Sequence, residues 1–590
     1  MESGPSRFPG WVLAAITLFG AGVVLTTTLY FIHQSHWSGP AADLWFRLPH
    51  VERFFAGEDF FWQLFAEGGG HRMFFPNALF IVEFSLFRGT NVFLNACGLA
   101  LQAITAGLLI SCVWKEPHLS RSAAAFLTGL TGMLLFSSTQ ITNFVRPLNV
   151  CYFLAFAPLT WSVLALLRAR DAHQTEGRPK AARAWLVVSI AAATVATYSM
   201  FNGILGWPAL LLLSVGLRLP RLWIGFLALA AVAIVGPYFL DYAPSAAKDW
   251  PRLLASPGTY LAWVAGTLGG PLSWTHPFTG TLLGFGGILA GGLILLRFGA
   301  RRSPVGTLEA VYIGVLTFTL ASGFLAGLGR LGQWEESWRL ARYQTFVLLF
   351  WLSLAGLATL RLDRCASESP RPGRFRWALG AGLIAWLLLV LMPSHFREAQ
   401  KQMEVSARIR EANDAIRVGI DDPRVFRPLL PRVGFYLRGA NPVFAYSPFL
   451  HSHELGAFAS EKSRLLDLRI GADLSIDPKA RCRGEVTRHD VLSDRGETLG
   501  IRLAGWAWDE EQRAAPAWIL ISNQSGNTIG LGSRTKRKVN ALERAWSRTA
   551  VASWTAYARP AVGGRLTVWG VTTDRSVCRV VSVRIPGLSG

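Results

Sequence analysis

The sequence is poor in charged residues, which occupy only 16% of its 590 positions. Soluble chains carry about 25% Asp, Glu, Lys and Arg. By contrast, 51% of the residues are hydrophobic. They recur in runs of about twenty, the length of a helix that crosses the roughly 30 Å hydrocarbon core of a bilayer. The composition therefore excludes an ordinary soluble protein and predicts a polytopic membrane protein.

Acidic residues are scarcer than basic ones: 37 Asp and Glu stand against 58 Lys and Arg, for a formal net charge of +21. Much of the basic excess lies in short loops between apolar runs, at 168–183, 218–221, 297–302 and 361–376. Short basic loops are retained on the cytoplasmic side of a membrane. Because no nucleic-acid-binding module accompanies the charge, we interpret it as a topology signal and expect no nucleic-acid partner.

Cysteine is also scarce, with 6 residues in the chain. Four lie in or beside apolar runs and have no metal-ligand spacing, so no metal and no other cofactor is predicted: Cys97, Cys112, Cys151 and Cys365. The other two, Cys482 and Cys578, bracket the polar C-terminal region. They can form a disulfide if that region lies in an oxidising compartment, and we predict this disulfide.

The apolar runs predict a mainly α protein, a bundle of about 11 to 13 helices. Residues 11–32 are interpreted as an uncleaved signal anchor. Residues 73–88 are short and contain Glu83, and treating them as an incomplete span keeps the basic loop 168–183 inside. Residues 255–272 are Gly-rich and could be interfacial or re-entrant. The last expected span is 377–393.

This pattern predicts three domains. Residues 1–394 form the transmembrane domain, within which 33–72 is a first periplasmic loop with helices on the membrane surface. Residues 395–480 form a helical or irregular periplasmic connector. Residues 481–590 contain short alternating runs separated by turn residues, which predict an all-β sandwich. The N-terminus is then cytoplasmic and everything after 393 is periplasmic.

Two segments of the β-domain allow two interpretations. Residues 500–509 (GIRLAGWAWD) and the basic run 534–538 (RTKRK) could present aromatic and cationic contacts to a glycan. Alternatively, Trp506 and Trp508 straddle core and surface, and the basic run is a solvated hairpin.

The first outer loop contains the best candidate for a catalytic base. A transfer that joins a sugar to a hydroxyl needs a carboxylate to accept the proton, and Asp43 can fill this role. It also needs cationic groups near a departing phosphate, which suits His71 and Arg72. The alternative is that Asp43 caps a surface helix and that His71 and Arg72 touch lipid headgroups.

A second candidate site is the outer loop 329–343, whose arginines contradict the positive-inside trend. Arg330, Arg342 and the adjacent Tyr343 are candidates for binding a donor phosphate, because guanidinium groups recognise phosphate by planar, two-point contacts. Arg339 lies in the same loop. The alternatives are pairing with Glu335 and Glu336, or packing beneath the β-domain.

Two further loops are less specific. Residues 137–149 place Gln140, Asn143 and Arg146 at a span edge, and residues 199–208 form a broken membrane segment around Asn202. Irregular backbone at membrane depth occurs only where it lines a cavity or is buried in protein. Asn143 and Asn202 are therefore possible substrate-binding residues, although helix-to-helix turning explains both loops equally well.

The order of these motifs resembles the GT-C superfamily of polytopic glycosyltransferases, in particular its bacterial members with a periplasmic C-terminal extension. The motifs are an Asp after the first span, H-R-x-x-F-P at 71–76, S-x-x-Q-x-x-N at 137–143, S-x-x-N-G-x-x-x-W-P at 199–208 and G-R…R-Y at 329–343. The resemblance covers roughly residues 10–395 and implies an inverting transfer from a polyprenyl-phosphate sugar, with the acidic residue of the first outer loop as base.

One position departs from the family pattern. Relatives often carry Glu directly before the His-Arg pair, whereas this chain has Gly70, with Glu67 four residues before His71. The departure leaves Asp43 as the main candidate for the base, with Glu58 and Asp59 as reserves and possible substrate-binding residues.

The expected function is thus transfer of a sugar to an envelope glycan or lipid acceptor, in the inner membrane of a bacterium and in contact with membrane lipids. A lipid-linked oligosaccharide flippase is one alternative, but a carrier usually shows paired internal repeats or charges within spans, and the sequence has neither. An O-antigen ligase or polymerase would normally carry its large loop between late spans. A non-catalytic scaffold is the third alternative.

Overall fold

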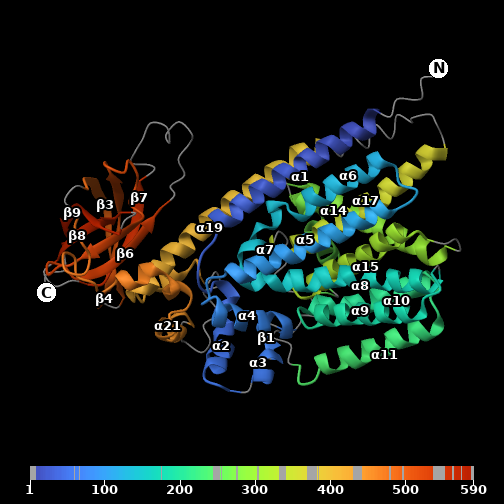
Figure 1. Ribbon diagram of the computed structural model, residues 1–590, viewed down its shortest axis with the longest axis horizontal. Coiled ribbons are helices and arrows are strands. Elements are labelled where there is room, and N and C mark those ends of the chain that lie inside the picture. Colours follow the sequence, from blue (N-terminus) through green and yellow to red (C-terminus); the bar gives the residue numbers. More distant parts are fainter. Residues whose placement is uncertain are drawn as a thin grey trace. The chain divides into compact units, whose positions relative to one another are not determined.

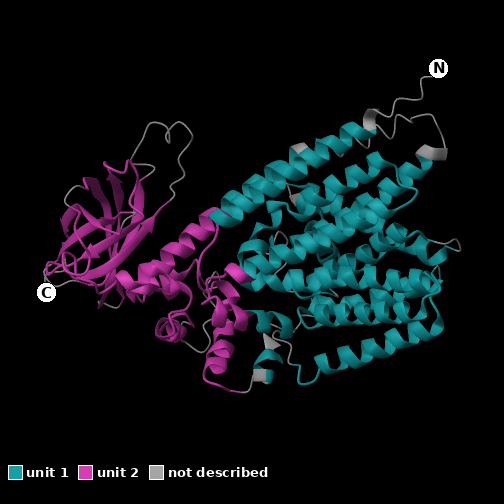
Figure 2. Cartoon of the chain, in the orientation of Figure 1, with its two compact units in different colours: residues 1–34, 59–79, 94–401 teal, residues 35–58, 80–93, 402–590 magenta. Residues whose placement is uncertain are grey.

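The computed structural model describes residues 8–586 except 59, 66, 69, 175, 243–252, 254, 274–276, 302–304, 331–340, 369–381, 383–384, 430–441, 478–479, 495–496, 536–551, 561–563 and 573–574. The chain forms two compact units (Figure 2). Unit 1 contains residues 1–34, 59–79 and 94–401, and unit 2 contains residues 35–58, 80–93 and 402–590. Parts of the first outer loop therefore belong to the same unit as the C-terminal domain.

Within the described residues, 9 helices are long and apolar enough to cross a membrane. They contain α1 (Phe8–Gln34), α5 (Val92–Lys115), α6 (Arg121–Leu135), α8 (Val150–Gln174), α9 (Pro179–Thr197), α11 (Arg221–Tyr238), α14 (Pro277–Ala300), α15 (Thr307–Leu328) and α17 (Gln344–Glu368) (Figure 1). The prediction of a mainly helical, polytopic membrane protein is confirmed.

Three expected runs form shorter helices. Residues 73–88 form α4 (Phe74–Leu86) and 255–272 contain α13 (Pro257–Gly269), each 13 residues long. At 1.5 Å per residue such a helix covers about 20 Å, less than the hydrocarbon core. The run at 203–217 forms η4 (Phe201–Leu205) and α10 (Gly206–Gly216). Of the expected last span, 377–393, residues 377–381 and 383–384 lie outside the described residues.

The helices of unit 1 differ in how much of their surface the protein covers. In α8, 89% of the apolar window is buried inside the protein, whereas the figure is 17% for α11 and 22% for α1. A helix that is apolar on all sides but exposed must face lipid, so α8 is central and the others are peripheral. Small residues permit close helix contacts: a Cβ at Gly284 of α14 would lie 1.8 Å from the carbonyl oxygen of Ala265 in α13.

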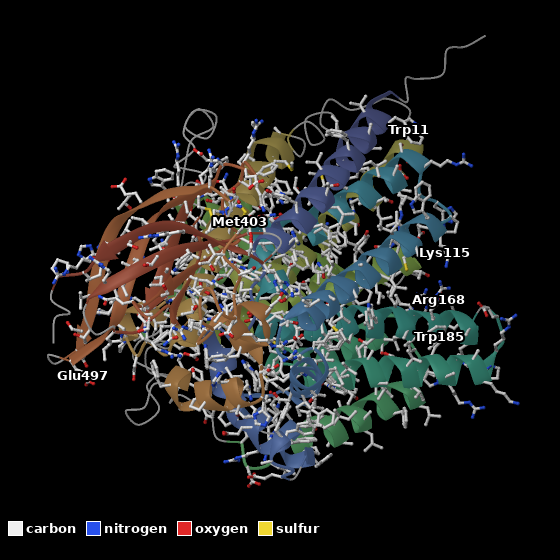
Figure 3. All side chains as sticks on the ribbon, turned by 60° about the vertical axis from the view of Figure 1, so that its left-hand side comes forward. Trp11, Lys115, Arg168, Trp185, Met403 and Glu497 are labelled. Carbon is white, nitrogen blue, oxygen red and sulfur yellow. A yellow bond between two sulfur atoms is a disulfide. The ribbon has the colours of Figure 1, made fainter. Side chains whose placement is uncertain are left out.

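One end of unit 1 carries basic and amphipathic side chains. Figure 3 shows Lys115 and Arg168 at the same end as Trp11 and Trp185. The two tryptophans are 50% and 43% exposed, as expected for rings at a membrane–water interface. The end of the bundle that holds these residues therefore has side chains typical of a membrane–water interface.

The first outer loop is helical. It forms η1 (Ala42–Arg47), α2 (Leu48–Phe55) and α3 (Phe60–Phe65), followed by a short hairpin of β1 (Glu67–Gly68) and β2 (His71–Arg72). Near the C-terminal side, η7 (Leu387–Leu391) leads into the long α19 (Met392–Val418). The remaining helical segments of unit 2 are α20 (Pro423–Phe426), α21 (Pro442–Ser452), η8 (Gly456–Ala459) and η9 (Glu461–Leu465).

The C-terminal domain is all-β, as predicted. Its strands are β3 (Cys482–Asp494), β4 (Glu497–Asp509), β5 (Trp518–Ser522), β6 (Thr528–Arg534), β7 (Ser553–Ala558), β8 (Arg565–Val571) and β9 (Val577–Arg584). They form one antiparallel sheet in the order β3-β4-β7-β6-β5-β8-β9, where two facing sheets were expected. The sheet curls around a core that includes Ile501, Leu503, Ile519 and Val568, so that its edge strands β3 and β9 contact each other.

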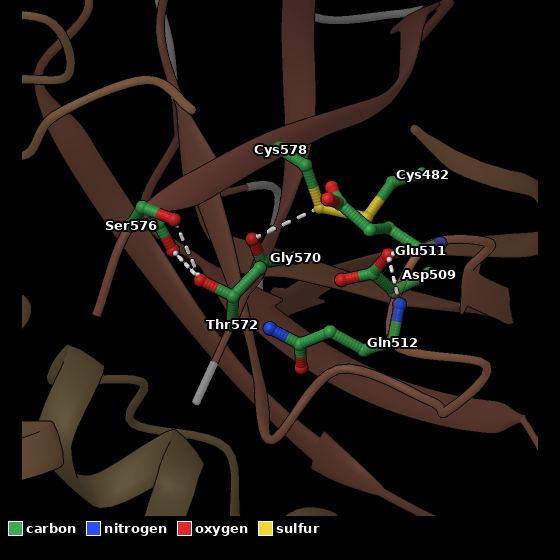
Figure 4. Close-up of a disulfide and its surroundings, with 8 residues drawn as sticks. All are labelled: Cys482, Asp509, Glu511, Gln512, Gly570, Thr572, Ser576 and Cys578. Carbon is green, nitrogen blue, oxygen red and sulfur yellow. Dashed lines mark hydrogen bonds between the residues drawn. A yellow bond between two sulfur atoms is a disulfide. The ribbon is translucent and has the colours of Figure 1, made fainter. Parts of the chain in front are cut away.

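The predicted disulfide is present and joins these two edge strands (Figure 4). Cys482 begins β3 and Cys578 lies in β9, 96 residues further along the chain. The Cys578 sulfur also lies 3.4 Å from the carbonyl oxygen of Gly570 on the neighbouring strand β8. On the chain-entropy model, closing a loop of this length stabilises the fold by about 4 to 5 kcal/mol. Such bonds are common in oxidising compartments and rare in the cytosol.

Candidate functional site

Two polar motifs that are far apart in sequence form one hydrogen-bond network in unit 1. Nδ2 of Asn143 donates to Oγ1 of Thr345 at 2.8 Å and to the carbonyl oxygen of Arg342 at 3.0 Å. The Thr345 hydroxyl donates to Oε1 of Gln140 at 2.9 Å. Nδ2 of Asn149 donates to Oδ1 of Asn143 at 2.9 Å. The network fixes the backbone at Arg342, in the turn that precedes α17.

Arg330, Arg342 and Tyr343 gather at this turn. Nε of Arg330 donates to the Tyr343 hydroxyl at 2.8 Å, and the Arg342 guanidinium carbon lies 5.6 Å from the centre of the Tyr343 ring. The ring of Tyr152, in α8, lies 6.5 Å from that of Tyr343, and the ring of Trp263 lies 6.0 Å from it. Two guanidinium groups thereby lie beside an aromatic cluster built from two helices, α8 and α13, and the turn before α17.

The start of α17 adds to the positive potential of this cluster. Arg342 and Tyr343 lie in η6 (Ala341–Tyr343), and the 25-residue helix α17 begins at the next residue, Gln344. The N-terminus of a helix carries about half a positive charge, and its free N–H groups favour anions. Arginine side chains beside such a terminus form an environment suited to a phosphate group.

Three residues of the second candidate loop, Glu335, Glu336 and Arg339, lie outside the described part of the chain. The pairing of the loop arginines with these two glutamates stays one of the alternatives.

The guanidinium group of Arg72 donates hydrogen bonds to backbone carbonyl groups. Its guanidinium donates from Nε to the Tyr238 carbonyl at 2.7 Å, from Nη1 to the Phe65 carbonyl at 3.4 Å, and from Nη2 to the Leu240 carbonyl. Its backbone N–H donates to the Tyr238 hydroxyl at 3.1 Å. Arg72 thus satisfies carbonyls at the C-terminus of α11, where a cation is favourable. A phosphate contact for Arg72 stays a prediction.

His71 is also attached to the membrane bundle. Its Nδ1 accepts a hydrogen bond from the backbone N–H of Phe201 at 3.3 Å. The next residue, Asn202, donates from Nδ2 to the Ser322 carbonyl at 3.5 Å. The two motifs that contain His71 and Asn202 therefore meet in unit 1. The sequence contained no signal for Tyr238, which completes this arrangement from α11.

Asp43, the predicted base, lies in unit 2 as the second residue of η1 and is exposed. It makes no hydrogen bond or ion pair with another described residue. The residue that precedes η1 is Ala41, and no side chain caps this helix. The capping interpretation of Asp43 is therefore without a supporting contact in the described part of the chain.

The backbone directly before Asp43 is strained. Ala42 has a φ of 53°, a left-handed conformation that non-glycine residues rarely adopt. Its N–H donates to the Leu429 carbonyl at 2.6 Å, and such a conformation costs on the order of 1 to 3 kcal/mol. Strain of this kind persists only where the surrounding structure enforces it, and it clusters at functional sites.

The surrounding structure does hold the segment before Asp43. Nδ2 of Asn91 donates to the carbonyl oxygens of Trp37 and Gly39 at 3.0 and 2.8 Å, and the Asn91 N–H donates to Oε1 of Glu83 at 2.7 Å. Glu83 is completely buried. In the sequence it was only an argument against a membrane span, and Asn91 carried no signal. Together they fix the chain that presents Asp43.

The reserve acidic residues are less well placed or not described. Glu58 is exposed and lies 3.8 Å from Arg53 in a surface ion pair. Asp59 is outside the described residues, as is the side chain of Glu67. Within the described residues, no group of three or more His, Cys, Asp or Glu side chains could hold a metal ion.

Comparisons with known proteins give little further information. No protein-family model matches the chain, and no curated protein matches its sequence. Among solved structures, the chain is similar to the archaeal oligosaccharyltransferase AglB from Archaeoglobus fulgidus, solved in complex with an inhibitory peptide and a dolichol-phosphate. The TM-score is 0.38 and the identity 14%, over 69% of this chain and 58% of that chain. A similarity this distant supports no conclusion about the activity of this protein.

Proposed function

We propose that this chain is an inverting membrane glycosyltransferase that transfers a sugar from a polyprenyl-phosphate donor to an envelope glycan or glycolipid. The observation that supports the proposal best is the cluster of Arg330, Arg342 and Tyr343 at the start of α17. In this cluster two arginines lie beside the N-terminus of a helix. Residues of two motifs that are far apart in the sequence, 137–149 and 329–343, build it.

The chemistry of the donor matches this cluster. When the bond between the anomeric carbon and the phosphate oxygen breaks, the phosphate keeps the electron pair and its negative charge grows. Guanidinium groups fixed beside that oxygen stabilise the transition state more than the ground state. Tyr343 holds Arg330 in position through its hydroxyl. In this proposal Arg330 and Arg342 bind the donor phosphate.

Asp43 is the proposed general base. As the acceptor hydroxyl oxygen bonds to the anomeric carbon, its proton passes to the carboxylate. Attack on the face opposite the phosphate inverts the anomeric configuration. Asp43 is exposed, its carboxylate makes no hydrogen bond or ion pair with another described residue, and the backbone before it is strained, and these three features support this role. His71, Asn143 and Asn202 then serve to build or line the substrate-binding region.

We propose that the C-terminal domain is periplasmic and the N-terminus cytoplasmic. With α4 and α13 not crossing and the segment of η4 and α10 (201–216) crossing, the loops at 168–183, 218–221 and 297–302 all fall on the side of the N-terminus, as the positive-inside rule requires. The loops at 139–147 and 329–343 fall on the opposite side. A reporter that is active only outside the cytoplasm should work when fused after residue 590, and an inactive fusion contradicts this orientation.

The proposed activity is tested by envelope glycan composition. A deletion strain should lack one sugar substituent, wild-type protein should restore it, and Arg342→Ala should not, although it accumulates in the membrane. Arg361→Ala is the matched control, because Arg361 is an exposed arginine further along α17. An unchanged envelope in the deletion strain would overturn the proposal.

A further inference from the structure

Unit 2 contains a polar groove that the proposed reaction does not use. Its volume is about 500 Å³, and it lies within unit 2 among α19, α20 and the strands β3, β4 and β7. Its charged and aromatic lining residues are Arg408, Glu411, Asp422, Arg424, Asp490, Arg502 and Tyr557. Three guanidinium groups and three carboxylates thus line the groove, and their charges balance.

Several of these groups are held in fixed positions by one another. Oε1 of Glu411 accepts hydrogen bonds from Nη2 of Arg502 at 2.7 Å and from the Tyr557 hydroxyl at 3.0 Å. Asp422 accepts from both Nε and Nη2 of Arg424, at 2.9 and 2.7 Å. The lining is therefore preorganised, so a ligand does not have to order these long side chains on binding.

Some hydrogen-bonding capacity in the groove is not used within the protein. Nε of Arg502 is buried and has no hydrogen-bond partner among the described residues. Arg408 is exposed and makes no hydrogen bond or ion pair with the described part of the chain. A buried donor without a partner costs about 1 to 3 kcal/mol. The exposed guanidinium of Arg408 is accessible to a ligand, and a sugar hydroxyl can accept a hydrogen bond from it.

The same face of the sheet continues from the groove to two tryptophans. Arg502, Trp506 and Trp508 alternate along β4 with the core residues Ile501, Leu503 and Ala507, so all three lie on the face away from the core. At about 3.4 Å per residue along the strand, Trp506 lies about 14 Å from Arg502, and Trp508 lies about 20 Å from Arg502. Neither indole belongs to the core of the domain.

The tryptophans have polar neighbours and free indole groups. Trp506 pairs across the strands with Glu485, and Trp508 pairs with Arg483. Both indoles are partly exposed, and neither indole N–H donates to another described residue. Along β4, each of the two tryptophans thus presents an aromatic ring beside a charged side chain. These rings lie on the same face of the sheet as Arg502, which lines the groove.

We infer that this groove and the two tryptophans form a binding site for a neutral oligosaccharide. Neighbouring hydroxyl groups of a sugar match the paired acceptors of a carboxylate and the paired donors of a guanidinium. The C–H face of a sugar ring packs against the electron-rich face of an indole. A phosphate or a nucleic acid would instead require an excess of cations, which this balanced lining lacks. The site lies apart from the proposed reaction and does not rest on it.

The test is a glycan array of neutral and acidic microbial oligosaccharides, probed with the full-length protein in detergent. We expect binding to neutral members, followed by calorimetric titration of the strongest one. Loss of one charge-assisted contact should weaken binding about tenfold, so Arg408→Ala should show at least this loss. Trp508→Ala removes the aromatic face that packs against the sugar ring and should also weaken binding. Arg408 is exposed and makes no hydrogen bond or ion pair with another described residue, and Trp508 is partly exposed, so both variants should stay folded.

Two controls separate this site from others. Arg565→Ala, another exposed arginine of the sheet domain, and Arg342→Ala should both bind the glycan as the wild type does. Raising the salt from about 0.05 M to about 0.5 M should change the affinity little, because screening weakens only interactions between charges. Binding restricted to acidic glycans, a steep loss with salt, no binding to any neutral glycan, or wild-type affinity in Arg408→Ala would overturn the inference.

Discussion

Charged residues are used in two different ways in the two units. In unit 2, Asp414 is buried and bonds to Arg417 at 2.6 Å and to Lys462 at 2.7 Å, while the Ser533 hydroxyl donates to it at 2.6 Å. In unit 1, by contrast, Arg330 donates to the neutral hydroxyl of Tyr343. The first cluster neutralises its charge within the protein, whereas in the second a guanidinium group is held by a neutral aromatic hydroxyl.

Some charged side chains stabilise the fold, and others are accessible to a ligand. Burial alone raises the pKa of Asp414, but the Lys462 ammonium and the Arg417 guanidinium outweigh it, and the net shift is downward. The carboxylate is therefore ionised and committed to α19 and its neighbours. Asp43, in the same unit, is exposed and uncommitted. Substitutions in the two groups should separate stability from activity.

The largest expected effect is on the reaction. Asp43→Asn keeps the size of the side chain but cannot accept the proton, so transfer should fall by about 10² to 10⁴. Expression, thermal stability and donor binding should stay unchanged. Envelope glycan analysis and a purified transfer assay measure this, with Glu52→Gln on the exposed side of α2 as the control. Wild-type transfer in Asp43→Asn would remove the base assignment and turn attention to Glu58, Asp59 and Glu67.

Substitution of the buried Asp414 should lower stability, in contrast to substitution of Asp43. Asp414→Asn leaves two buried cations without their carboxylate, and breaking a buried ion pair in this way costs about 3 to 5 kcal/mol. Thermal unfolding in detergent should report a clearly lower melting temperature. Asp467→Asn is the control, because its ion pair with Arg559 is exposed and is worth about 0 to 1 kcal/mol. Equal stability of the two variants would contradict a structural role for the cluster.

Arginine geometry provides a finer test of unit 1. Arg342→Ala should weaken binding of a polyprenyl-phosphate sugar about tenfold, the effect of losing one charge-assisted contact. Arg342→Lys should recover only part of this affinity, because an ammonium cannot make a planar two-point contact with phosphate. Binding of a fluorescent polyprenyl-phosphate analogue measures both. Normal binding in Arg330→Ala and Arg342→Ala would assign these arginines to packing.

The smallest expected effect is a pH dependence of stability. Burial lowers the pKa of the Lys462 ammonium from 10.5 to about 8. Between these values the unfolded chain binds a proton that the folded chain lacks, so the free energy of unfolding should rise with pH. The slope is at most about 1.4 kcal/mol per pH unit. Lys462→Met should lose this slope when melting curves are compared with the wild type. If the stability of the wild type does not rise with pH relative to that of Lys462→Met, the lowered pKa of Lys462 is contradicted.

The sequence by itself determined the parts of this protein that depend on local pattern. Apolar runs of span length identified the membrane helices, alternating runs identified the β-domain, and Cys482 and Cys578 were correctly paired. These features follow from the period and length of hydrophobic segments, which are properties of neighbouring residues.

Only the tertiary structure decided which distant residues meet. It joined residues 35–58 and 80–93 to the C-terminal unit, closed the strands into one curled sheet, and linked Asn143 to Thr345 across 202 positions. It also showed that the guanidinium of Arg72 donates a hydrogen bond to a carbonyl at the C-terminal end of α11. A hydrogen bond depends on the path of the whole chain, so the residue types in a motif show what a side chain can bind but not which partner it reaches.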